Sequence, residues 1–307
     1  MRYRRRGTAI TIIIIAFLLA IALGCGYYFL KDMSDYKEAD ETYEKIKENI
    51  TVSNDVVEPE DDPVITYPDL KINYDNLMKI NGDFVGVIYL PALDLCYPVA
   101  HSKDNKDYLD TSFEGKKLFA GCIFLDSYAH PDFTDYNSFI FGHNMKDGSM
   151  FGSLKRMLKE REGTELCEKD PYIYIYTPEK VLKYHIFSYT LIATDDPGYD
   201  FAYNDVETSW FNRPDLTPQL ESVYDRYVKE AQERSEYIPS ETEADDFAAR
   251  PKLLSLSTCS GYGHVKFFLL HSALIGEANT KIPVLTNSVN SLIPMGKPAG
   301  LAKTVRF

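Results

Sequence analysis

The sequence predicts a mainly β protein with inserted helices, joined to one transmembrane helix at its N-terminus. Three observations support this fold class. A charge-free apolar run occupies residues 7–30. Short segments rich in β-branched and aromatic residues recur from residue 84 onward, bounded by Gly, Pro, Asn or Asp. Amphipathic helical patterns interrupt these segments in two places. Many short strands with two inserted helices favour a β-barrel or closed sheet.

Length and composition narrow the class of protein. The chain has 307 residues, 45% of them hydrophobic, which is enough for one sizeable core with appendages. Its net charge of −13 argues against a nucleic-acid-binding protein. The cysteines show no metal-ligand spacing, so we expect neither a metal nor another cofactor. They are scattered through a chain large enough to fold without disulfides, so we expect mostly free thiols. The cysteines are Cys25, Cys96, Cys122, Cys167 and Cys259.

The N-terminal segment, residues 1–30, is predicted to be a cytoplasmic basic stub followed by a transmembrane signal-anchor. Four arginines between Arg2 and Arg6 precede the apolar run. About 20 apolar residues cross a hydrocarbon core, and the basic cluster keeps the N-terminus inside. Everything after Lys31 is therefore expected outside the cell. A cleaved or lipoprotein signal stays open as an alternative, because Ala22-Leu-Gly-Cys25 faintly resembles a lipoprotein cleavage box.

Residues 31–69 are predicted to form an acidic extracellular spacer. Residues 35–50 fit a solvated helix, and residues 51–68 read as a linker containing Pro59, Pro63 and Pro68. The spacer lifts the following domain off the membrane.

A folded domain is expected over residues 70–276, followed by a tail, 277–307, to which we assign no role. A short helix is predicted at 72–80, and two longer ones at 149–159 and 216–235. A hairpin is expected around Pro178-Glu-Lys180. The predicted strands are 84–90, 93–99, 118–125, 138–141, 172–176 and 181–193.

The run Leu253–Cys259 reads as an apolar strand that ends on a cysteine, and the turn Gly261-Tyr-Gly263 follows. A cysteine held at the end of a rigid strand is well placed for a nucleophile. A lone cysteine in an apolar run is more often a small buried hydrophobic residue. Ser257 and Thr258, just before Cys259, are expected to shape the floor of a substrate pocket.

A second informative stretch is an apolar strand that ends at Gly142, with His143 at its tip and a polar turn after it. An imidazole beside a thiol can hold the sulfur as thiolate and later protonate a leaving amine. The ordinary alternative is a surface or core histidine. His264 and His271 also remain open as partners of Cys259 at this stage.

These motifs resemble one enzyme family. Leu256-Ser-Thr-Cys259 resembles the active-site signature of sortases. Phe141-Gly-His-Asn-Met-Lys-Asp-Gly-Ser-Met-Phe151 is similar to the histidine segment of class B sortases. Asp83–Pro91, Tyr97-Pro-Val99 and Gly121–Asp126 look like the opening strands of that class. The helix at 216–235 matches its long helix. The resemblance covers residues 70–276.

The resemblance implies a sortase-type closed β-barrel of about eight strands and a transpeptidation. The Cys259 thiolate attacks a carbonyl in the C-terminal sorting signal of a secreted protein and forms a thioacyl enzyme. His143 protonates the departing amine, and an amino group of a peptidoglycan precursor or a pilin takes the acyl chain. Two alternatives remain: a catalytically weak binding or assembly protein with the same fold, and a cysteine peptidase with water as acceptor.

One position departs from the family pattern. The family places an arginine on the strand after the cysteine, where it binds substrate and the developing oxyanion. Here that strand carries Phe267, Phe268 and Leu269, with Lys266 as its basic residue. Lysine lacks the bidentate fork of arginine. Three interpretations stay open: Lys266 substitutes by a shift in register, an arginine from elsewhere such as Arg250 serves, or the enzyme is weak or inactive and its fold is kept for binding.

Overall fold

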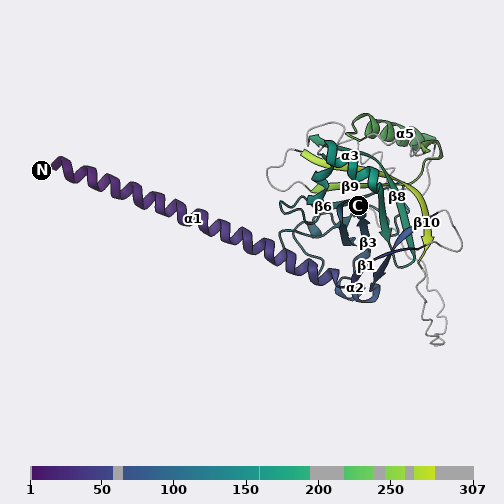
Figure 1. Ribbon diagram of the computed structural model, residues 1–307, viewed down its shortest axis with the longest axis horizontal. Helices are drawn as coiled ribbons and strands as arrows, with labels where there is room; N and C mark the ends of the chain where they lie inside the picture. Colours follow the sequence, from purple (N-terminus) through teal and green to yellow (C-terminus); the bar gives the residue numbers. More distant parts are fainter. Residues whose placement is uncertain are drawn as a thin grey trace, which may run out of the picture.

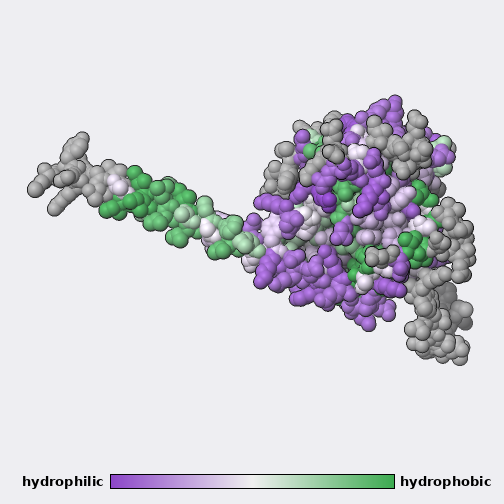
Figure 2. Space-filling view, in the orientation of Figure 1, coloured by the Kyte–Doolittle hydropathy of each residue, from purple (hydrophilic) through white to green (hydrophobic). Residues whose placement is uncertain are grey.

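A long N-terminal helix leads into a closed β-barrel in the computed structural model (Figure 1). The structure describes residues 2–57, 65–158, 160–193, 218–237, 246–259 and 266–280. Helix α1 (Arg2–Lys47) has 46 residues, and its outer part stands clear of the barrel. From Thr11 it is long and apolar enough to cross a membrane. Figure 2 shows its apolar surface beside the largely hydrophilic face of the domain.

Eight strands close the barrel in the order β10-β8-β7-β3-β4-β5-β6-β9, which confirms the predicted closed barrel. Most neighbours are antiparallel, whereas β4–β5 and β6–β9 are parallel. The strands are β3 (Phe84–Leu90), β4 (Leu95–Ala100), β5 (Phe124–Leu125), β6 (Asn137–His143), β7 (Tyr172–Tyr176), β8 (Lys180–Ala193), β9 (Leu253–Cys259) and β10 (Lys266–Asn279).

Local sequence explains several of these strands. Alternation in Tyr172–Tyr176 gives β7, and the predicted hairpin with β8 is confirmed by their antiparallel register. Thr177 closes the turn, since its Oγ1 accepts a hydrogen bond from the Lys180 amide at 3.0 Å. The strand predicted at 118–125 is shorter, because only Phe124 and Leu125 pair with neighbours. Fully buried apolar side chains fill the core, among them Val87, Ile88, Ile140, Tyr184 and Leu270.

The helices agree only in part with the sequence prediction. The short helix α2 (Tyr74–Ile80) and the longer α5 (Pro218–Glu233) lie where helices were expected. The helix predicted at 149–159 is a 3₁₀ helix, η3 (Gly152–Leu158), followed by α3 (Glu160–Lys169), which was not foreseen. Among the described residues, further short 3₁₀ helices are η1 (Pro91–Leu93), η2 (Asp107–Leu109) and η8 (Phe247–Ala249).

The solvated spacer predicted for residues 31–69 is wrong where the structure describes it. The helix expected at 35–50 is present as the last part of α1, which ends at Lys47, but Ala39, Tyr43 and Ile46 on it are buried rather than solvated. Strand β1 (Ile50–Val57) then pairs antiparallel with β2 (Tyr67–Ile72), where a linker was expected. The β-branched residues at positions 50, 52, 56 and 57 favour this strand. Residues 58–64 lie outside the described residues.

The boundary of the predicted C-terminal tail, 277–307, also falls differently. Strand β10 continues to Asn279, and its end pairs with the start of β8 at Lys180. Residues 281–307 lie outside the described residues, so the assignment of no role to them stays a prediction.

Candidate active site

The two predicted site residues, His143 and Cys259, end neighbouring parallel strands. Seven consecutive residue pairs join β6 to β9, from Asn137 opposite Leu253 to His143 opposite Cys259. Neighbouring strands lie about 4.8 Å apart. The fold therefore brings together two backbone positions that are 116 residues apart in the chain (259 − 143).

A glycine just before the histidine is required by close packing. A Cβ atom at Gly142 would lie 2.7 Å from the ring of Phe151 and would clash with the side chain of Ile123. The Phe151 ring occupies the space that a side chain at position 142 would take. This packing brings the segment after His143 back against the end of β6.

The histidine loop, residues 144–151, returns to the strand that it leaves. The Phe151 amide donates to the carbonyl of His143 at 3.0 Å, and Asn144 bridges to Met150. Met150 has a φ of 51°, in the left-handed region that a side chain disfavours. Its amide donates to the Tyr97 hydroxyl at 3.0 Å. The loop is therefore held in one conformation from outside as well as from within.

Side chains within and after the histidine loop add further support. The Asp147 carboxylate accepts hydrogen bonds from the amide and hydroxyl of Ser149, at 3.0 and 2.7 Å. The Lys155 ammonium donates to the carbonyl of Met145 at 3.0 Å. These contacts give the polar turn after His143 an architectural role.

The environment of His143 favours its neutral form. Burial lowers the pKa of His143 below its ordinary value, and the negative charge of Asp110 partly opposes this effect. Its Nδ1 atom is buried and has no hydrogen-bond partner among the side chains that the structure describes. A neutral imidazole with an unused nitrogen can take a proton from a nearby acid and return it.

The two residues before Cys259 are buried in β9. Thr258 ties β9 to β10, because its Oγ1 accepts a hydrogen bond from the Phe268 amide at 3.1 Å. Ser257 is 1% exposed, and its hydroxyl has no partner among the described groups. Thr258 therefore has a structural task, whereas the Ser257 hydroxyl remains unused.

Lys266, the predicted substitute for the family arginine, begins β10. Its side chain is exposed, and its backbone lies opposite Ala193 of β8. The register of β9 with β10 ends on Ser257 opposite Leu269. Continued by two residues, it sets Phe267 opposite Cys259, which leaves Lys266 on the alternate face.

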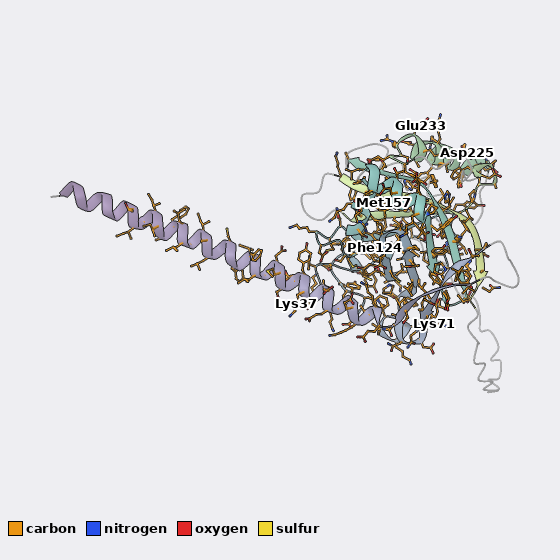
Figure 3. The ribbon with its side chains drawn as sticks, in the orientation of Figure 1. Lys37, Lys71, Phe124, Met157, Asp225 and Glu233 are labelled. Carbon is orange, nitrogen blue, oxygen red and sulfur yellow. The ribbon has the colours of Figure 1, made fainter. Side chains whose placement is uncertain are left out.

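The alternative that Arg250 serves this role is wrong. Its guanidinium forms two hydrogen bonds of 2.9 Å with the Asp225 carboxylate and a 3.4 Å ion pair with Glu221. Figure 3 shows Asp225 on α5, at the outer surface of the domain. Arg250 also precedes β9, a strand about 20 Å long, and Cys259 ends that strand. The guanidinium is therefore committed to α5 at the far end of β9.

The structure distinguishes between the two other histidines that the sequence left open as partners of Cys259. His264 lies outside the described residues. His271 is buried in β10, within hydrogen-bond distance of the hydroxyls of Ser255 (2.9 Å) and Tyr227 (3.1 Å). Burial lowers the pKa of His271 to about 3. This histidine is a neutral core residue, four positions along β9 from the pairing with Cys259.

Two residues near the histidine were not found by sequence reasoning. Tyr97 holds the histidine loop, and the charge of Asp110 acts on the imidazole. Neither belongs to a motif with a fixed spacing to His143. The relevant proximity arises from the barrel, which sets β4 two strands from β6. A single sequence carries no signal for that register.

Comparison with known proteins relates the chain to sortases. The family model described as the sortase domain matches residues 88–267. Sortase B of Listeria monocytogenes is 30% identical over 184 residues, which span 60% of this chain and 65% of that protein. Sortase B of Staphylococcus aureus is 25% identical over 263 residues, which span 84% and 91%. The match to the Listeria protein thus spans slightly less than two thirds of its length.

Solved structures agree. The crystal structure of sortase B from Bacillus anthracis in complex with AAEK1 has a TM-score of 0.58 and 24% identity. The alignment covers 79% of this chain and 98% of that one. At this identity the likeness concerns the fold alone, and it agrees with the eight-stranded barrel.

Proposed function

Because this chain belongs to the sortase family, and within it to class B, we propose that it is a membrane-anchored cysteine transpeptidase. Cys259 is the nucleophile, and His143 is its acid and base. The substrate is a secreted protein with a C-terminal sorting signal, and the acceptor is an amine of a peptidoglycan precursor or a pilin.

The observation that carries this proposal is the pairing of His143 with Cys259 at the ends of β6 and β9. Residues in register on neighbouring strands project to the same face of a sheet. This rule supports the proposal that Cys259 and His143 act together. The buried, unpartnered Nδ1 of His143 supplies a group suited to a thiol proton.

The reaction follows from these two groups. His143 accepts the proton of the Cys259 thiol, and the resulting thiolate attacks the carbonyl carbon of the scissile amide to form a tetrahedral oxyanion. The C–N bond breaks, His143 gives its proton to the leaving amine, and a thioester remains on the sulfur. The acceptor amine then attacks the thioester carbonyl, loses a proton to His143, and displaces the thiolate. Two acyl transfers thus restore the enzyme without net change in its charge.

The supporting residues have proposed roles of their own. The unused hydroxyl of Ser257 and the buried Thr258 shape the floor of the substrate pocket. Lys266, the first residue of β10, stabilises the oxyanion in place of the family arginine, because it is the basic residue of that strand and its side chain is exposed.

The long apolar helix supports an anchored enzyme. The run from Thr11 has the length and composition of a membrane span and is not buried against the domain. The arginines before it favour an inside N-terminus, which sets the barrel on the outer side. Both the sorting signal and the acceptor amine are available on that side.

The test uses the full chain in detergent with a labelled sorting peptide and a soluble amine. Mass spectrometry is expected to find a thioester on Cys259 and a product whose yield depends on the amine. Cys259→Ala removes both, whereas the control Cys96→Ala keeps them. A rate of hydrolysis that does not change when the amine is added would indicate a peptidase. Absence of any adduct on Cys259 would indicate a binding protein.

A further inference from the structure

The apolar part of α1 continues without a break into the part of the same helix that packs on the barrel. The charge-free run ends at Leu30, and the residues just before it, from Tyr27 on, are more than 60% exposed. Helix α1 then continues to Lys47, and no loop separates the two parts. A continuous helix transmits position and orientation along its length, which a flexible linker cannot do.

The last turns of α1 are packed firmly on the barrel. Ala39, Tyr43 and Ile46 lie on one face and are 4%, 5% and 1% exposed. The Tyr43 hydroxyl donates to the carbonyl of Gly121 at 2.5 Å. These side chains belong to the core of the domain, so α1 and the barrel form one packed unit.

The same turns of α1 reach the histidine loop through one tyrosine. The rings of Tyr43 and Tyr97 meet edge to face at 5.6 Å, and the Lys47 ammonium lies 5.1 Å from the Tyr97 ring centre. On its other side, the Tyr97 hydroxyl accepts the Met150 amide of the histidine loop. A path of direct contacts therefore joins the anchor helix to the segment that carries His143.

A second path leads from α1 to the site on the side nearer the membrane. Tyr36 of α1 meets Phe119 edge to face at 5.0 Å. Two residues before Phe119, Lys117 pairs with Asp110, whose charge acts on His143. Figure 3 places Lys37, next to Tyr36 in the chain, where α1 meets the domain.

The contact between α1 and the domain begins close to the end of the apolar run. Leu30 and Tyr36 are six residues apart, or about 9 Å of helix. The polar layer of a leaflet is about 5–7 Å deep outside the hydrocarbon. Figure 1 shows β6 and β9 on the side of the barrel that faces the N-terminal part of α1. The two strands that carry the candidate site therefore lie on the side of the barrel toward the apolar run.

We propose that α1 is a rigid mount that fixes the height and orientation of the active site above the membrane. This inference rests on the proposed function and deepens it. The enzyme then acts on peptide segments that are themselves held by the same membrane, at a distance that matches the mount. Helix α1 is thus a positioning element that selects substrates by the spacing between their scissile bond and their membrane segment.

The experiment lengthens the mount in the full chain, reconstituted in vesicles. Seven helix-forming residues inserted after Met33 raise the barrel by about 10 Å and turn it by only about 20°. Two substrates carry the same sorting peptide. One is soluble, and the other is joined by a short spacer to a membrane-spanning helix. A soluble amine serves as acceptor in both assays.

The soluble peptide is expected to react at the wild-type rate, which shows that the variant folds. The membrane-held substrate is expected to react at least about tenfold more slowly, because its spacer no longer spans the gap. Adding three or four residues to that spacer, at about 3.3 Å each, should restore the rate. As a matched control, seven Gly and Ser residues at the same point should abolish the sharp dependence on spacer length.

Unchanged turnover of the membrane-held substrate after the helical insertion would overturn the rigid mount. So would a lost rate that no spacer length restores, if the soluble peptide still reacts normally. Failure of the wild type to turn over even the soluble peptide is a different result, because it contradicts the proposed transpeptidase itself.

Discussion

Strand β9 carries two pairings of a nucleophile-type residue with a histidine, one on each side. Ser255 lies opposite His271 of β10, and four residues later Cys259 lies opposite His143 of β6. By residue type and register the two pairings look alike. Their surroundings separate them.

The inner pairing, Ser255 with His271, is buried, and its polar atoms already have hydrogen-bond partners. Ser255 and His271 are 0% and 3% exposed, and the Ser255 hydroxyl also donates to the Asn137 side chain at 2.9 Å. Tyr227 of α5 covers both. The outer pairing, His143 with Cys259, lies at the ends of β6 and β9. The Nδ1 atom of His143 has no hydrogen-bond partner among the described residues. Hydrogen-bond distance between a hydroxyl and an imidazole therefore does not mark a catalytic pair; a polar group without a partner at the end of a strand is the better guide.

The largest expected effect lies at the outer pairing. Cys259→Ala and His143→Ala should each lower kcat/KM for a sorting peptide by about a thousandfold or more, because the two groups act as one unit. The midpoint of thermal unfolding should change little. Ser255→Ala is the matched control at the inner pairing, and it should keep the activity per folded molecule. A Ser255→Ala enzyme as inactive as His143→Ala would erase the distinction drawn above.

The next effect concerns the missing arginine. Lys266→Ala should lower the rate of acylation by about 10- to 100-fold if the ammonium stabilises the oxyanion. Lys266→Arg should retain or exceed wild-type activity, because the guanidinium forms two hydrogen bonds at once. Stopped-flow acylation with the sorting peptide measures this step.

Phe267, the next residue on β10, provides the control for the Lys266 variant. It is partly buried against the core, so Phe267→Ala should act mainly on stability. Equal acylation by Lys266→Ala and wild type would remove Lys266 from the site and leave the register argument standing.

The inner pairing should control acid stability. Burial lowers the pKa of His271 to about 3, whereas the unfolded chain titrates near 6.5. Between these values the unfolded state binds more protons, so stability falls as pH falls from about 6.5 to about 3, by up to about 1.4 kcal/mol per pH unit. Urea unfolding at several pH values in this range gives the slope of the unfolding free energy against pH. In His271→Asn this slope should be smaller, by an amount that corresponds to at most one bound proton. Equal slopes would contradict the sealed environment.

Local pattern was enough to predict some elements. Alternating aromatic and aliphatic residues place β7 at 172–176, and a run of β-branched residues places β3 at 84–90. The strand ends at His143 and Cys259 were predicted from the polar and Gly-rich turns that follow them, and the parallel register brings those ends together.

Non-local contacts escaped the sequence. Residues 51–68 read as a linker because of their prolines and acids, but β1 is stabilised by pairing with β2. The burial of Tyr43 depends on contacts with Tyr97 and Gly121, which no period within α1 reveals. A local sequence pattern describes one helix or strand at a time, whereas each of these contacts depends on two elements that lie far apart in the chain.

The smallest effect tests that unforeseen contact. Tyr97→Phe keeps the ring that packs on Tyr43 and removes only the hydroxyl that accepts the Met150 amide. Losing one such bond costs about 1 kcal/mol, so kcat should fall about three- to tenfold while KM for the soluble peptide stays close to wild type. Tyr176→Phe is the matched control, since it loses a hydroxyl bond to the Pro68 carbonyl away from the histidine loop. If both variants lose stability equally and neither loses kcat, Tyr97 only packs, and the contact between anchor helix and histidine loop has no catalytic consequence.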